Sequence, residues 1–165
     1  RRFEAELMAL QGHAIAEQGG GADAQVLLQR ASALALEVAR SYCGPWCLGV
    51  QALHTPNAER AQQLLAQGEA LLAEDCVSHN HPEYRRVAIE YSLRRGNFRE
   101  ARRHAEALAD YSRDEPLVLC DLIVRRARYF ADRADEPGRE DLAAAHSALV
   151  RDITAADFRW LLRGL

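Results

Sequence analysis

Small residues recur in one register along this chain, and that register constrains the fold more than any other feature. Gly12 precedes Ala24 by 12 residues, and Gly49 precedes Ala61 by the same interval. Both marks repeat after 37 residues, and an alanine returns 40 residues later at Ala101. A small residue midway along one helix and another early in the next allow two helices to approach closely. The spacing therefore predicts a series of stacked helical hairpins.

Glycines mark the expected turns of two hairpins. Gly19 lies five residues before Ala24, and Gly96 lies five residues before Ala101. Glycine tolerates the left-handed backbone conformation in which many helices end. We therefore expect the first and third hairpins to turn at these positions.

Composition supports a helical protein. Alanine supplies 30 of the 165 residues, whereas valine and isoleucine are sparse. Alanine loses no side-chain freedom in a helix, and β-branched residues do. The length suits about four hairpins, and no strand is expected. No apolar run approaches the roughly 20 residues of a membrane-spanning helix.

Breaks in the apolar pattern give the expected elements. Phe3, Leu7, Leu10 and Ala14 share one face and predict the buried side of the first helix. Gly44-Pro45 is expected to end the second helix and start the third. First helices are predicted at about 2–18, 45–54, 82–95 and 117–134, second helices at about 22–42, 57–75, 97–112 and 139–153. Thr55 or Asn57 would cap the 57–75 helix.

The predicted fold is an all-α, right-handed superhelix of about four tetratricopeptide-like hairpins with a C-terminal capping helix. It would form a single domain, 1–165, with hairpins at about 2–42, 45–75, 82–112 and 117–153 and the cap at 155–165. The expected core positions are Gly12, Ala24, Leu28, Ala31, Gly49, Ala61, Leu65, Ala101, Ala105, Leu108 and Ala127.

Several segments carry a more specific resemblance: 68–73, 76–81, 88–90, 96–98, 107–111 and 115–117, with Ala101 between them. Together they resemble the tetratricopeptide C-terminal region of large bacterial sensor proteins, in which adenylate/guanylate cyclase and STAND-type ATPase domains precede the repeats. The maltose-regulator type of ATP-dependent transcription factor is the alternative. Either resemblance implies a cytoplasmic interaction or sensor-coupling module within a larger protein. We expect no enzymatic activity from the segment, because without any lysine it cannot form a P-loop.

Charge argues against two classes of partner. All 21 basic residues are arginine, a usage typical of GC-rich genomes, and the net charge is −3. No basic run accompanies a continuous apolar stripe, so we expect neither nucleic acid nor a membrane surface as a partner. A protein or peptide segment, within the parent chain or outside it, is the expected ligand.

Cysteine and histidine suggest an alternative: a small metal- or redox-responsive helical domain. Cys43 and Cys47 flank Gly-Pro-Trp but follow no strand, unlike a redox dithiol. Cys76, His79 and His81 are metal-ligand types without a second pair at finger spacing. We expect reduced thiols and neither a metal nor another cofactor.

If a partner binds, the repeat register places the binding surface on the first helices. Arg86, Glu90 and Arg94 follow one another at four-residue intervals and share a face, although both arginines could simply pair with Glu90. The predicted groove residues are Glu6, His13, Glu17, Trp46, His54, Arg86, Glu90, Arg94 and Arg128. This set suits an extended segment carrying a carboxylate and an apolar anchor, with Trp46 as the anchor's contact.

Overall fold

The computed structural model describes residues 1–74 and 76–165, and all regular structure in these residues is helical. The helices are α1 (Arg2–Glu17), α2 (Gly21–Val38), α3 (Arg40–His54), α4 (Ala58–Leu72), α5 (Asn80–Arg94), α6 (Phe98–Tyr111), α7 (Val118–Asp135) and α8 (Leu142–Ala155), followed by a 3₁₀ helix, η1 (Arg159–Leu162). The all-α prediction is therefore confirmed. The predicted end of the fourth helix at Asp75 lies outside the described residues.

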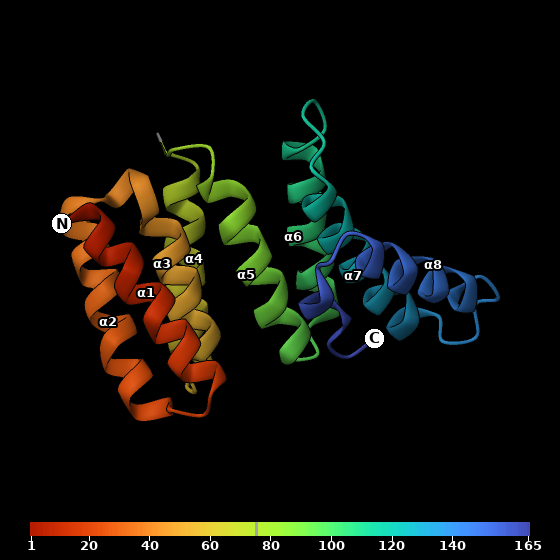
Figure 1. Cartoon of the computed structure of the whole chain (residues 1–165), viewed down its shortest axis with the longest axis horizontal. Helices are drawn as coiled ribbons and strands as arrows, with labels where there is room; N and C mark the ends of the chain where they lie inside the picture. The colour runs from red at the N-terminus through yellow and green to blue at the C-terminus, as the bar shows by residue number, and fades with distance from the viewer. Residues whose placement is uncertain (75) are drawn as a thin grey trace. The chain divides into compact units, whose positions relative to one another are not determined.

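The chain forms two compact units, Arg1–Ala88 and Ile89–Leu165. We call them unit 1 and unit 2. In unit 1, α1 packs against both α2 and α3, α2 packs against α3, and α3 packs against α4. Figure 1 shows α1 and α2 side by side, joined by a short connection. In unit 2, α7 packs against α6 and α8, and η1 packs against α8.

The two predicted glycine turns have the same geometry. Gly19 and Gly96 adopt positive φ values of 90° and 66°. At each, the glycine N–H and the following N–H donate back to carbonyls of the preceding helix: Gly19 to Ala16, Gly20 to Ile15, Gly96 to Leu93 and Asn97 to Ser92. This is the Schellman cap. The alanines five residues later, Ala24 and Ala101, are fully buried.

The predicted boundary between the second and third helices is wrong. Gly44 and Pro45 lie inside α3, and the break falls at Ala39, whose φ is −146°. Pro45 has no N–H to give the Ser41 carbonyl. That carbonyl instead accepts from the Val77 N–H at 2.9 Å and from Asn80 Nδ2 at 3.1 Å. A tertiary contact thus compensates for the proline, and the helix continues.

The predicted buried face of α1 is also wrong. Phe3, Leu7 and Leu10 are 53%, 64% and 48% exposed, and Ala14 is exposed as well. The buried side is the opposite one, formed by the small residues Ala5, Ala9 and Gly12. A Cβ on Gly12 would lie 2.8 Å from Leu28 of α2, so the close approach of α1 and α2 requires glycine there.

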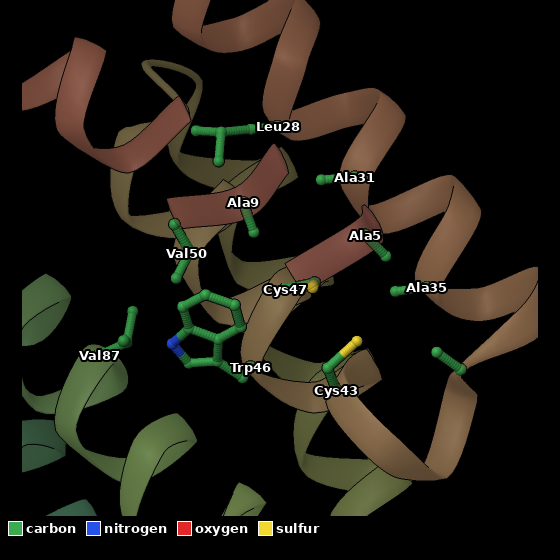
Figure 2. Close-up of a cluster of buried hydrophobic side chains, with 11 residues drawn as sticks. Ala5, Ala9, Leu28, Ala31, Ala35, Cys43, Trp46, Cys47, Val50 and Val87 are labelled. Carbon is green, nitrogen blue, oxygen red and sulfur yellow. The ribbon is translucent and has the colours of Figure 1, made fainter. Parts of the chain in front are cut away.

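The core of unit 1 is built from alanines, two thiols and one indole, together with Leu28, Val50 and Val87 (Figure 2). The expected core positions are buried except Leu65, which is half-buried while Leu64 is 1% exposed. Gly49 is buried, but the atoms nearest to a Cβ there belong to Tyr84 and Val87 of α5, so the spacing does not give Gly12 and Gly49 equivalent neighbours.

Asn57 rather than Thr55 caps α4: its side chain accepts from the Arg60 N–H at 2.8 Å. Asn97 caps α6 in the same way through the Glu100 N–H at 3.3 Å. The C-terminal cap predicted at 155–165 contains η1, whose Leu161 is buried in the core of unit 2.

Candidate functional site

One side of α1 faces α3, and this side carries three of the polar residues that were predicted to line the groove. Glu6, His13 and Glu17 follow one another along this side because residues three or four apart, and their multiples, align on a helix. Their partners lie at the two ends of α3: Tyr42 in its first turn and His54 at its last residue.

At the first end, aromatic rings form a row across neighbouring segments. The Phe3 ring lies edge-on to Tyr42 with centroids 5.7 Å apart, and Tyr42 lies edge-on to His79 at 5.2 Å. The Arg2 guanidinium lies 4.7 Å from the Phe3 centroid and 5.1 Å from the Tyr42 centroid. Edge-to-face pairs and a guanidinium over a ring are each favourable contacts. The Tyr42 hydroxyl also donates to Glu6 at 3.5 Å.

At the other end, two imidazoles and a carboxylate converge. His13 Nδ1 lies 2.7 Å from His54 Nε2, and His54 Nε2 lies 3.9 Å from Glu17 Oε1. The His54 side chain is only 8% exposed. Its backbone is held on both sides, because its carbonyl accepts from the Gln25 side chain of α2 and the Thr55 hydroxyl donates to the Gln51 carbonyl at 2.7 Å.

Trp46 does not lie on an accessible surface. It is 7% exposed and belongs to the unit 1 core, where Figure 2 shows its indole beside Val50 and Val87. It cannot offer the exposed hot spot that the sequence suggested. Its Nε1 is buried without a hydrogen-bond partner among the described residues.

The arginines of the predicted groove are engaged in ion pairs. Arg86 pairs with Glu83 at 2.9 Å. In unit 2, Arg94 pairs with Glu90 at 2.9 Å, and Arg128 pairs with Glu106 at 2.6 Å.

Sequence reasoning missed Arg126, a buried partner of Glu90 inside unit 2. Its side chain is 7% exposed, lies 3.1 Å from Glu90 and also donates to the Arg163 carbonyl at 2.8 Å. Burial alone would raise the pKa of Glu90, but the hydrogen bond from Arg94 and the charge of Arg126 outweigh it and lower that pKa. Arg126 follows Leu122 by four residues on the buried side of α7, and that spacing was the available signal.

The alternative prediction named two groups of residues, the cysteine pair and the cysteine–histidine set, and the structure gives them different surroundings. Cys43 and Cys47 are both buried, and the hydrogen bond between their thiols together with burial raises the pKa of Cys47. Cys76 donates to the Leu71 carbonyl at 2.9 Å, and the pKa of His81 is lowered by burial and by Arg85. With His79 packed on Tyr42, the Cys76, His79 and His81 set forms no metal-ligand cluster within the described residues.

No described helix is both long enough and apolar enough to cross a membrane. Comparison with protein-family models, with curated proteins and with solved structures gives no match to this chain.

Proposed function

We propose that unit 1 is a tetratricopeptide-like protein-binding module whose first helices bind an extended peptide segment. The observation that carries the proposal is the row Phe3–Tyr42–His79, in which each ring comes from a different segment: α1, α3 and the residue before α5. In a helical-repeat protein these are the first helices of successive hairpins, and together they form the ligand surface.

The packing of unit 1 supports the repeat interpretation. Each first helix of a stacked array contacts its own hairpin partner and the next first helix. α1 contacts α2 and α3, and α2 contacts α3, in agreement with that pattern. A right-handed superhelix of such hairpins is part of the proposal. So is the role implied by the resemblance to bacterial sensor proteins, in which the module would couple a bound segment to other domains.

The side chains at the Phe3–Tyr42–His79 row indicate which kind of ligand would bind there. Phe3 presents an exposed ring, and Arg2 presents a guanidinium held against that ring. An apolar side chain would pack on Phe3 and Tyr42, and a neighbouring carboxylate would pair with Arg2. The ligand is therefore a peptide with an aromatic or aliphatic residue next to an acidic one.

A peptide-display selection on the purified protein tests this proposal. We expect enrichment of peptides that combine an apolar residue with an adjacent acid, and at least tenfold weaker binding to Phe3→Ala. Val26→Ala is the control, because Val26 is an exposed apolar residue (59%) on α2. Equal affinity for the Phe3→Ala and wild-type proteins, or no enriched class, would show that the row is not the binding surface.

A further inference from the structure

The cluster of His13, Glu17 and His54 has the composition of a zinc site. Among the described residues it is the group of histidine, cysteine and acidic side chains whose ligand atoms all lie within 4.8 Å of one another. Two imidazole nitrogens and a carboxylate oxygen are the three protein ligands found in His₂Glu zinc centres. We propose that His13 Nδ1, His54 Nε2 and Glu17 Oε1 bind one Zn²⁺ ion.

The geometry requires only side-chain adjustment. Zinc bonds of about 2.0–2.1 Å at tetrahedral angles place neighbouring ligand atoms roughly 3.4 Å apart. The 2.7 Å separation of the two nitrogens would open by about 0.7 Å, and the 3.9 Å separation of His54 Nε2 and Glu17 Oε1 would close by about 0.5 Å. His13 and Glu17 lie one helical turn apart, so both can turn toward His54 without a change in the backbone.

The surroundings hold the central ligand in place. Gln25 of α2 donates to the His54 carbonyl, and the next residue, Thr55, donates through its hydroxyl to the Gln51 carbonyl. Both hydrogen bonds fix the backbone at the C-terminal end of α3, from which the His54 side chain extends. His54 also lines a shallow cavity of about 350 Å³ together with Ala16, Gly21, Ala22, Gln25 and Pro56. A tetrahedral ion with three protein ligands keeps a fourth position, which water or a small anionic ligand would occupy.

Charge favours the ion over a purely hydrogen-bonded pair of histidines. At 2.7 Å the two nitrogens can share only one proton, and protonation of both rings would bring two cations together. A zinc ion uses a lone pair of each neutral imidazole, and the Glu17 carboxylate offsets part of its charge. Binding would cross-link the C-terminal ends of α1 and α3 within unit 1, independently of any peptide bound at Phe3.

Zinc titration of the chelator-treated protein, followed by calorimetry and by the thermal midpoint, tests the inference. We expect one equivalent to bind and to raise the midpoint. His13→Gln and Glu17→Gln should each weaken binding at least tenfold. Glu17 is exposed and His13 is half-buried, and circular dichroism would verify that each variant keeps its helical content. His146→Gln in unit 2 and the triple variant Cys76→Ser/His79→Gln/His81→Gln are the controls and should bind zinc as the wild type does.

Cobalt substitution supplies a second readout. A Co²⁺ complex with this ligand set should give visible d–d bands without a thiolate charge-transfer band. Binding that survives in both α1 variants, binding that is lost only in the triple variant, a thiolate band, or the absence of zinc binding would each overturn the proposal.

Discussion

Gly96 shows how one residue fixes a turn. Its φ of 66° belongs to the left-handed region, which costs a residue with a side chain roughly 1–2 kcal/mol. We therefore predict that Gly96→Ala lowers the free energy of unfolding by about 1–2 kcal/mol, measured by urea denaturation. Gly138→Ala is the control, since Gly138 has no positive φ and open space around its Cβ position. Equal losses in the two variants would contradict the assigned cap.

Asn80 compensates for a proline at a distance of 35 residues in sequence. It is fully buried, and its Nδ2 lies 3.1, 2.9 and 3.2 Å from the carbonyls of Ser41, Tyr42 and Val77. Asn80→Ala would remove a buried donor that three carbonyls share, and we predict a loss of about 2–3 kcal/mol in unfolding free energy.

Asn57→Ala is the matched control for Asn80→Ala. It removes an exposed helix cap and should cost about 1 kcal/mol. A smaller loss for Asn80→Ala than for Asn57→Ala would mean that α3 tolerates Pro45 without the tertiary contact.

At the scale of elements, Gly68 determines how closely α4 meets α5. A Cβ there would lie 2.6 Å from Cε2 of Tyr84 and 3.2 Å from the Pro45 carbonyl oxygen. Tyr84 is fully buried, and its hydroxyl donates to the Leu65 carbonyl at 2.5 Å, so the ring has little room to move. We predict that Gly68→Ala destabilises the protein by roughly 1–3 kcal/mol in urea denaturation, although alanine favours helix.

Gly44→Ala provides the contrast within α3. A Cβ on Gly44 would make an ordinary contact of 3.4 Å with Leu71. The helix propensity of alanine should then leave stability unchanged or raise it by up to about 1 kcal/mol. If both variants destabilise the protein alike, close packing at Tyr84 is not the cause.

The sequence predicted elements well wherever the signal was local. The glycine turns at Gly19 and Gly96 depend on a few neighbouring residues, and they were predicted correctly. The cap of α4 was narrowed to Thr55 or Asn57, and the structure selects Asn57. Pro45 was misjudged because its compensation comes from Val77 and Asn80, which only tertiary structure brings near. The face of α1 was misjudged because large apolar side chains are normally buried, whereas here close packing selects the small ones, such as Ala9.

At the scale of the whole molecule, the spacing of residues in the sequence predicts which helix face they share. It does not give the distances between helices. It placed His13, Glu17 and His54 on the first helices without showing that they meet. Trp46 was also predicted to face the groove from a first helix, but it lies in the core of unit 1. Arg126 escaped notice because a buried arginine is rare unless it is paired, and its partner Glu90 lies 36 residues away.

The ion pairs of unit 2 make its stability depend on pH. The pKa of Glu90 is lowered from its ordinary value of 4.5, so its pairing stabilises the folded state fully above that pH and is lost as the pH falls through the lower, folded-state pKa. We predict that Glu90→Gln lowers the free energy of unfolding by roughly 3 kcal/mol at pH 7, because it leaves Arg126 buried without its carboxylate. The same variant should reduce the acid-induced loss of stability below pH 4.5.

The matched control is Glu106→Gln, in the same unit. Glu106 pairs with Arg128, but their side chains are 49% and 43% exposed, so solvent screens the pair and the change should cost less than about 1 kcal/mol. Urea denaturation of the wild type and both variants at several pH values between 3 and 7 measures the two effects. If the wild type and Glu90→Gln lost equal unfolding free energy on acidification, the pairing of Glu90 would not be the cause of the pH dependence.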